Sequence, residues 1–364
     1  MTSTRPMIPI AKPLVSEEEK QAVLEVLDSG QLAQGARTAE FERVFAEYVG
    51  TKHAIAVANG TAALIVALQA NGVGQGDEVI TTPFSFIATA TSIIACGATP
   101  VFVDVDPFDL NLDPNRIEDA ITDRTKAIMP VHLYGHPARI AEIREICNDN
   151  GLALIEDAAQ AHGAEHAGQR VGSFGTGCFS FYPTKNMTTG EGGMITTNDD
   201  DVARLARIIR HHGQEQRYLH EYFGLNWRMT DLAAAIGLVQ MRHIEEWNQA
   251  RIANAETLSS LITQVQTPVV REGDRSVFHQ YTIRVEGDRD EFQRRLEGVG
   301  VGSAVHYPIP IHRQPIMQQL GFGDAELPVT EAAAAAVLSL PVHPSLSRAD
   351  LEYIAESVNK LARP

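Results

Sequence analysis

Seven short apolar runs, separated by stretches with helical periodicity, constrain the fold of this chain more than any other feature. We expect strands at 54–58, 78–81, 100–104, 127–131, 152–156, 179–182 and 194–197. Continuous apolar strands that alternate with helices are typical of a mostly parallel sheet with helices on both faces. The sequence therefore predicts an α/β fold whose large lobe is built on a mixed, mostly parallel sheet.

The rest of the chain indicates helices around this sheet and a smaller second lobe. Ser16 begins a capping-box pattern, and one long helix is expected at 230–261. Strands at 279–285 and 301–307 are expected to flank a helix at 290–298, followed by a short helical stretch at 331–340 and a last helix after Ser347. Because 364 residues exceed the usual size of a single core, we predict a large domain at 1–245 and a small α+β domain at 246–364.

The composition argues against several classes of protein. A net charge of −16 and a pI near 5.2 disfavour a general nucleic-acid or anionic-membrane surface. Cys96, Cys147 and Cys178 lack metal-ligand spacing, which favours reduced thiols in the cytoplasm. The first residues contain no apolar segment typical of a signal peptide. We predict a cytoplasmic protein with no metal and with neither nucleic-acid nor membrane partners.

Lys185 is a candidate catalytic residue. It follows an aromatic strand that stops at Pro183, and a glycine-rich segment, Gly190 to Gly193, comes next. A lysine delivered from a strand end into a space without bulky side chains suits an amine that forms a Schiff base with an aldehyde. The alternative is an ordinary surface lysine after a strand.

Asp157 is the second candidate, because it ends the apolar run at 152–156. Ligands of open α/β sheets bind beyond the carboxyl ends of strands, so Asp157 and Lys185 are expected to converge. A carboxylate beneath a pyridine nitrogen keeps that nitrogen protonated, as the chemistry of pyridoxal phosphate requires. The alternative for Asp157 is a helix N-cap.

A phosphate site is expected where the run at 54–58 turns into a helix. Asn59, Gly60 and Thr61 would present backbone N–H groups and a hydroxyl at the helix N-terminus, and Ser180 would add a second hydroxyl. Phe86, just after another strand, is placed to stack on a cofactor ring. The alternatives are common turn chemistry for the first group and a core position for Phe86.

Taken together, these segments resemble the DegT/DnrJ/EryC1/StrS family of sugar aminotransferases, within the fold-type I enzymes that use pyridoxal phosphate. The resemblance extends over nearly the whole chain, in the order 9–13, 30–35, 59–61, 83–91, 131–135, 156–163, 181–185, 224–229 and 306–312. It implies the aspartate aminotransferase-like fold and a homodimer with shared active sites.

The resemblance also implies a role for individual residues. Lys185 matches the lysine that binds the cofactor covalently and moves a proton, and Asp157 matches the acid at the ring nitrogen. Gln160 matches the residue at the phenolic oxygen, and Asn226 matches an asparagine that reaches the phosphate of the neighbouring subunit. The remaining cofactor contacts are Gly60, Thr61, Phe86 and Ser180, and the implied substrate contacts are His162, Arg228, His306 and Tyr307.

The expected function is therefore an aminotransferase that moves an amino group, with glutamate as the expected donor, to a keto group of a nucleotide-linked sugar. Pyridoxal 5'-phosphate alternates with pyridoxamine 5'-phosphate in such a reaction, which predicts ping-pong kinetics. The segment at 306–310 resembles relatives that aminate C3 more than those that aminate C4.

Three other functions stay open. The first is a sugar dehydratase, a lyase or a keto-cyclitol aminotransferase of the same family, although the retained Lys185 argues against dehydration. The second is a sensor that binds the cofactor without turnover. The third is a zinc hydrolase, because His162, Glu165 and His166 match an inverted zinc-protease pattern, which requires a continuous helix.

Overall fold

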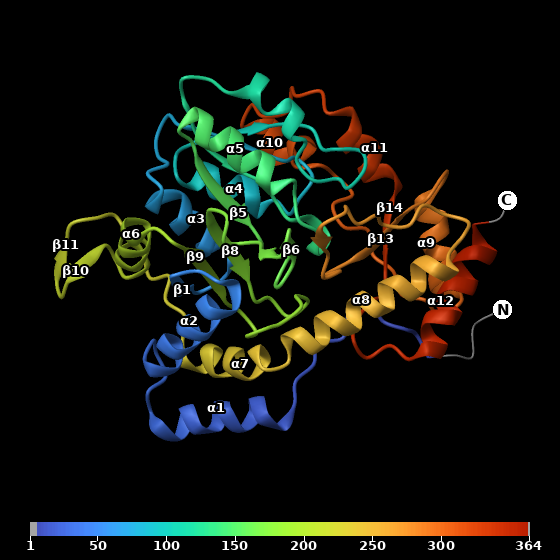
Figure 1. Ribbon diagram of the computed structural model, residues 1–364, viewed down its shortest axis with the longest axis horizontal. Helices are drawn as coiled ribbons and strands as arrows, with labels where there is room; N and C mark the ends of the chain where they lie inside the picture. Colours follow the sequence, from blue (N-terminus) through green and yellow to red (C-terminus); the bar gives the residue numbers. More distant parts are fainter. Residues whose placement is uncertain (1–5, 363–364) are drawn as a thin grey trace.

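In the computed structural model, which describes residues 6–362, a seven-stranded sheet forms the centre of the fold (Figure 1). The strand β9 is antiparallel to both of its neighbours, whereas all other neighbouring pairs are parallel. This arrangement confirms the predicted α/β class. Across the sheet, the strands are β1 (His53–Val57), β9 (Gly193–Thr197), β8 (Thr176–Ser180), β5 (Ala153–Asp157), β4 (Thr125–Met129), β2 (Glu78–Thr81) and β3 (Thr99–Phe102).

Side chains alternate between the two faces of this sheet, and both faces are buried. On β1, Ile55 and Val57 enter one hydrophobic core, whereas Ala54 and Ala56 enter another. Burial on both faces explains why the strands are apolar throughout. The first core is covered by α3 (Gly60–Ala70), α4 (Ala88–Ala95) and α6 (Asp200–Arg210), and the opposite face by α2 (Ala36–Val49), α5 (Ile140–Asn150) and α7 (Asp231–Met241).

The pairing of the strands brings three chain segments to one edge of the sheet. Asp157 at the end of β5 lies opposite Cys178 of β8 in a parallel pair. Because β9 is antiparallel to both β8 and β1, the ends of β8 and β1 also point the same way, with Ser180 and Val57 each opposite Gly193. The sheet therefore places Asp157, Ser180 and the start of α3 together.

A second, two-stranded sheet lies apart from the first in sequence and in space (Figure 1). The strand β13 (Tyr281–Arg284) pairs antiparallel with β14 (Val337–Leu340), and α8 (Ile244–Leu261), α9 (Arg289–Gly298) and α12 (Arg348–Leu361) supply the rest of its core. Ile8, near the N-terminus, also packs in this core and bridges to Val301. The predicted domain boundary between 245 and 246 stays a prediction.

The remaining elements are short or lie outside the two sheets. Among the described residues, no helix is both long and apolar enough to cross a membrane. The elements outside the two sheets described above are α1 (Glu17–Ser29), α10 (Pro315–Gln319), α11 (Pro328–Ala336), β6 (Glu165–His166), β7 (Gln169–Arg170), β10 (Gln214–Gln216), β11 (Leu219–His220), β12 (Asp274–Arg275) and the 3₁₀ turns η1 (Pro114–Arg116), η2 (Glu118–Ala120), η3 (Leu133–Gly135) and η4 (Ile311–Arg313).

Three predicted elements are wrong in part. The long helix at 230–261 is two helices, because α7 ends at Met241, packed against α1 and α2, and α8 crosses to the second sheet. The helical stretch at 331–340 stops at Ala336, since 337–340 pairs with β13 as the buried strand β14. The segment 301–307 forms isolated bridges rather than a strand. In the last two segments, tertiary pairing determines the local structure.

The predicted capping box is confirmed. The Ser16 and Glu19 side chains bond reciprocally to backbone N–H groups at the start of α1.

Candidate active site

Asp157 and Lys185 form the ionisable pair of the site. The Asp157 carboxylate accepts hydrogen bonds from Thr89 Oγ1 at 2.8 Å and from the Ala159 N–H at 3.2 Å. Burial raises the pKa of Asp157, and these hydrogen bonds oppose the rise. Lys185 lies in the turn after β8, where its N–H donates to Tyr182 O at 2.9 Å. Its side chain is partly exposed, yet desolvation of the amine lowers the pKa of Lys185 to about 8, against the attraction of Asp157.

The N-terminus of α3 approaches β8 unusually closely. Asn59 caps the helix by accepting from the Ala62 N–H at 2.8 Å, which leaves the first N–H groups of α3 directed outward. A Cβ on Gly60 would lie 2.6 Å from Ser180 Cβ, and a Cβ on Gly193 would lie 2.3 Å from Asn59 O. Glycine is therefore required at both positions. The resulting cradle joins a helix N-terminus to the Ser180 hydroxyl, which suits a phosphate.

Phe86 is a large apolar side chain that is mostly exposed to solvent. It is 61% exposed, just before α4, and Thr89 in the first turn of that helix bonds to Asp157. Phe84, two residues earlier, is fully buried. An exposed ring beside a buried carboxylate is suited to stacking on a planar ligand.

Gln160 is held by two tyrosines. Its Oε1 accepts from the Tyr134 N–H at 2.9 Å, and its Nε2 donates to Tyr307 OH at 3.0 Å. The rings of Tyr134 and Tyr307 are stacked, with centroids 6.4 Å apart and planes 6° apart. Both tyrosines have positive φ, 58° and 67°, a conformation that is costly for bulky residues. These contacts fix the orientation of the Gln160 amide.

His306 lies beside this group. Its Nδ1 is 2.8 Å from Ser339 Oγ, and its backbone carbonyl accepts from Tyr134 OH at 3.4 Å. Burial lowers the pKa of His306 to about 4, and the charge of Lys185 acts in the same direction. His306 is therefore a neutral imidazole at physiological pH.

Asn226 and Arg228 lie on the segment beside β1, whereas the charge of the Lys185 amine reaches the His162 ring. The His162 ring is fully buried against Phe179 and Phe181, with centroids 5.4 and 5.6 Å away, and burial lowers the pKa of His162 to about 3. Asn226 is exposed, and Arg228 Nη1 is 2.6 Å from His211 Nδ1. The contacts predicted for His162, Asn226 and Arg228 stay predictions.

The zinc-protease pattern does not form its helix. Glu165 and His166 belong to the short strand β6, and His166 Nδ1 lies 2.7 Å from Asp274 Oδ1. Across residues 6–362, no cluster of three or more potential ligand side chains is arranged for a metal. The pattern in the sequence therefore has no structural counterpart.

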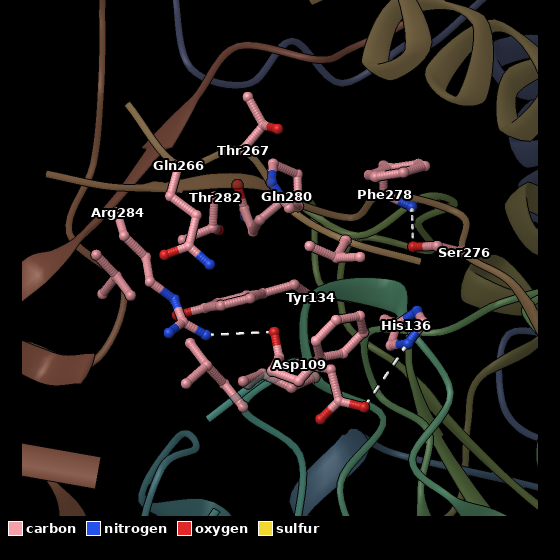
Figure 2. Close-up of a pocket in the computed structure, with 16 residues that line it drawn as sticks. Asp109, Tyr134, His136, Gln266, Thr267, Ser276, Phe278, Gln280, Thr282 and Arg284 are labelled. Carbon is pink, nitrogen blue, oxygen red and sulfur yellow. Dashed lines mark hydrogen bonds and ion pairs between the residues drawn. The ribbon is translucent and has the colours of Figure 1, made fainter. Parts of the chain in front are cut away.

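A cavity of about 50 Å³ is lined in part by Leu133 and Tyr134 of η3 (Figure 2). Figure 2 shows Tyr134, His136 and Arg284 around it, with Asp109 below. Neither Lys185 nor Asp157 lines this cavity. It is therefore separate from the candidate active site, with Tyr134 between the two.

Sequence reasoning missed Thr89, Tyr134 and Ser339. Thr89 and Tyr134 lie within segments that carry the family resemblance, which was the available signal. Their partners are 68 and 26 residues away, so the contacts themselves were not readable from the chain.

The comparison with known families agrees with this geometry. The model of the DegT/DnrJ/EryC1/StrS aminotransferase family matches residues 13–359. The chain belongs to this family, and it is an aminotransferase. The predicted family and enzyme class are confirmed.

Individual relatives cover nearly the whole chain. The Pseudomonas aeruginosa UDP-2-acetamido-2-deoxy-3-oxo-D-glucuronate aminotransferase is 42% identical over 94% of this chain and 96% of its own length. A Geobacillus stearothermophilus protein named as a pleiotropic regulatory protein is 44% identical, over 95% and 96%. The structure of S. venezuelae DesV, solved in complex with a ketimine intermediate, has a TM-score of 0.95 and 38% identity, and the match covers 99% of this chain and 100% of DesV.

Proposed function

We propose that this chain uses pyridoxal phosphate to transfer an amino group from a donor such as glutamate to a keto group of a nucleotide-linked sugar. The main observation in support is the Lys185–Asp157 pair, a lysine with a lowered pKa and a buried carboxylate at one edge of the sheet. Such perturbed groups cluster at catalytic sites. Membership of an aminotransferase family supports the same reaction class.

The residues present fit pyridoxal phosphate. The cradle formed by Gly60, Thr61 and Ser180 suits the phosphate, since helix N-termini favour anions. Asp157 suits the ring nitrogen, and the exposed Phe86 suits the ring face. The set thus offers one group to each chemical part of the cofactor.

When bound, pyridoxal phosphate supplies an electron sink for the reacting carbon. Asp157 would hold a proton at the ring nitrogen, and Gln160, fixed by Tyr134 and Tyr307, would orient the ring through its phenolic oxygen. Lys185, with a pKa of about 8, would take the proton from the donor carbon and return it, because an amine titrating near neutral pH serves in both directions.

The acceptor site is proposed beside His306 and Tyr307, with Arg228 and His162 as further contacts. Hydroxyl and imidazole groups suit a sugar, and an arginine suits an anionic substituent or phosphate. The name of the Pseudomonas relative specifies a 3-oxo sugar linked to UDP, which supports amination at C3.

The three cysteines are free, which supports the proposed cytoplasmic location.

The proposed enzyme is a homodimer in which Asn226 reaches the cofactor phosphate of the other subunit. Asn226 is exposed, on a segment that runs along the outer strand β1, where the Ala58 N–H donates to Trp227 O at 2.7 Å. The adjoining hairpin of β10 and β11 projects from the body of the subunit (Figure 1). An exposed, projecting segment supports a contact in trans.

The experiment replaces Lys185 with alanine. Absorbance of the covalently bound cofactor should disappear, and conversion to pyridoxamine phosphate by glutamate should slow by roughly 10²–10⁴-fold. Lys52→Ala, at an exposed lysine, should match the wild type. Retention of both signals in Lys185→Ala would refute the assigned role.

A sensor without turnover is the rival from a different class of protein, and the name of the Geobacillus relative is that of a regulator. The same experiment separates the two functions. A wild-type protein that binds the cofactor at Lys185 but never exchanges with an amino donor is a sensor.

A further inference from the structure

Within residues 6–362, Arg251 is a buried cation without an anionic partner. It lies on α8 and is only 7% exposed. Its Nη1 donates to Phe278 O at 3.3 Å, its Nε–H has no acceptor, and it forms no ion pair within residues 6–362. Burial lowers the pKa of Arg251 to about 10, which still leaves it charged at neutral pH. Burying an unpaired charge raises the free energy of the folded protein unless an anion compensates the charge.

Arg251 shares a small cavity with Lys185. The cavity has a volume of about 20 Å³, and Lys12 is the third basic residue in its wall. None of the described residues in its wall carries a carboxylate. One water requires roughly 10–15 Å³ by this measure, so the cavity suits a group the size of a carboxylate and is too small for a nucleotide diphosphate. Its charge and size together indicate a small anion.

We infer that Arg251 binds the side-chain carboxylate of a dicarboxylic amino donor, the class that contains glutamate and aspartate. The inference rests on the proposed function, in which the donor's amino group must reach the cofactor held at Lys185. The first carboxylate of the donor is bonded to the reacting carbon. The second is the group that extends away from it, and the cavity beside Lys185 offers that group a guanidinium.

The test measures ligand binding as well as turnover. Glutarate and butyrate, which differ by one carboxylate, are titrated into the protein loaded with pyridoxal phosphate, using calorimetry. The wild type should bind glutarate at least tenfold more tightly than butyrate. Arg251→Gln should reduce glutarate affinity to that of butyrate, and Arg251→Lys should recover part of it because the charge remains. Arg348→Gln, at an exposed arginine, should bind like the wild type.

Kinetics provide the second measurement. In Arg251→Gln, the half-saturating glutamate concentration should rise at least tenfold, whereas the amination of the keto sugar by the pyridoxamine phosphate form should change less than twofold. Unchanged glutarate affinity in Arg251→Gln, or a loss of nucleotide-sugar affinity instead, overturns the inference. In either case the absorbance of the cofactor bound at Lys185 remains, which distinguishes failure of this inference from failure of the proposed function.

Discussion

Loss of solvent contact shifts the pKa values of the two ionisable groups at the centre of the site in opposite directions. It disfavours the charged form of each, so it raises the pKa of Asp157 and lowers the pKa of Lys185. The attraction between the two groups opposes both shifts. The Lys185 amine therefore titrates in a range where proton transfer in both directions is fast.

A pH profile should reveal this balance. Covalent capture of pyridoxal phosphate requires the neutral amine, so its rate should rise through about pH 8 and level off above that, following the pKa of Lys185. Asp157→Asn removes the charge that raises the pKa of Lys185, so the midpoint should move to lower pH. The measurement is the initial rate of absorbance change after adding the cofactor to the apoprotein at each pH.

The control for this profile is Glu246→Gln, at an exposed carboxylate of α8. Its midpoint should equal that of the wild type. An Asp157→Asn midpoint that stays in place or moves to higher pH would contradict the proposed coupling.

Some single residues of the site could be predicted and others could not. Lys185 and Asp157 could be proposed from the sequence because both lie where an apolar strand ends, and strand ends mark ligand sites in α/β sheets. Thr89 could not be assigned from the chain, because its bond to Asp157 depends on how α4 meets β5. The fixed amide of Gln160 likewise depends on two tyrosines from separate segments.

The helices α2 and α7 are joined through one carboxylate. Asp231, in the first turn of α7, accepts from the N–H groups of Gly35 and Thr38 at 2.8 and 2.9 Å, and from Thr38 Oγ1 at 2.7 Å. Asp231 is 3% exposed, so its carboxylate takes the place of water as the acceptor for backbone N–H groups at the N-terminus of α2. This cap comes from an element almost two hundred residues away in the chain.

Removal of this cap should destabilise the protein. Asp231→Ala leaves several buried donors without an acceptor, which should lower the free energy of unfolding by about 3 kcal/mol. The measurement is the midpoint and slope of urea unfolding followed by circular dichroism. Asp28→Ala, at an exposed position of α1, should stay within about 0.5 kcal/mol of the wild type. Equal losses in both variants would show that Asp231 does not act as a cap.

The predicted elements failed where local preference and tertiary pairing disagree. Residues 331–336 form the expected helix, yet 337–340 leave it because β13 supplies backbone partners for a strand. The break between α7 and α8 reflects packing instead: Ile244 at the start of α8 lies in the same core as α7, whereas Ala255 and Leu258 lie in the core of the second sheet.

In the whole molecule, the residues proposed to bind the cofactor do not all lie together within one subunit. Lys185, Asp157 and the α3 cradle lie at one edge of the large sheet, whereas Asn226 lies exposed beside β1. The proposed dimer would complete the site by placing Asn226 of one chain near the cradle of the other.

Complementation tests this arrangement. Lys185→Ala and Asn226→Ala chains are each expected to be nearly inactive, because each lacks one part of every site. Mixed dimers contain one site in which both residues are wild type, so isolated heterodimers should regain up to half of the wild-type activity per dimer. Activity is measured after separation through two different affinity tags. Heterodimers without recovered activity would argue against Asn226 acting in trans.

Local patterns in the chain were sufficient for the α/β class, the order of most strands and helices, and the residues at the strand ends. These features depend on periodicity and residue type over short stretches, which are the same however the elements are arranged in space. Three features were decided by folding: the desolvated amine of Lys185, the two hydrogen bonds that hold the Gln160 amide and, within residues 6–362, the buried charge of Arg251 without an ion pair. Each arises where segments far apart in the chain exclude water from a polar group, and a free energy of desolvation exists only once those segments have met.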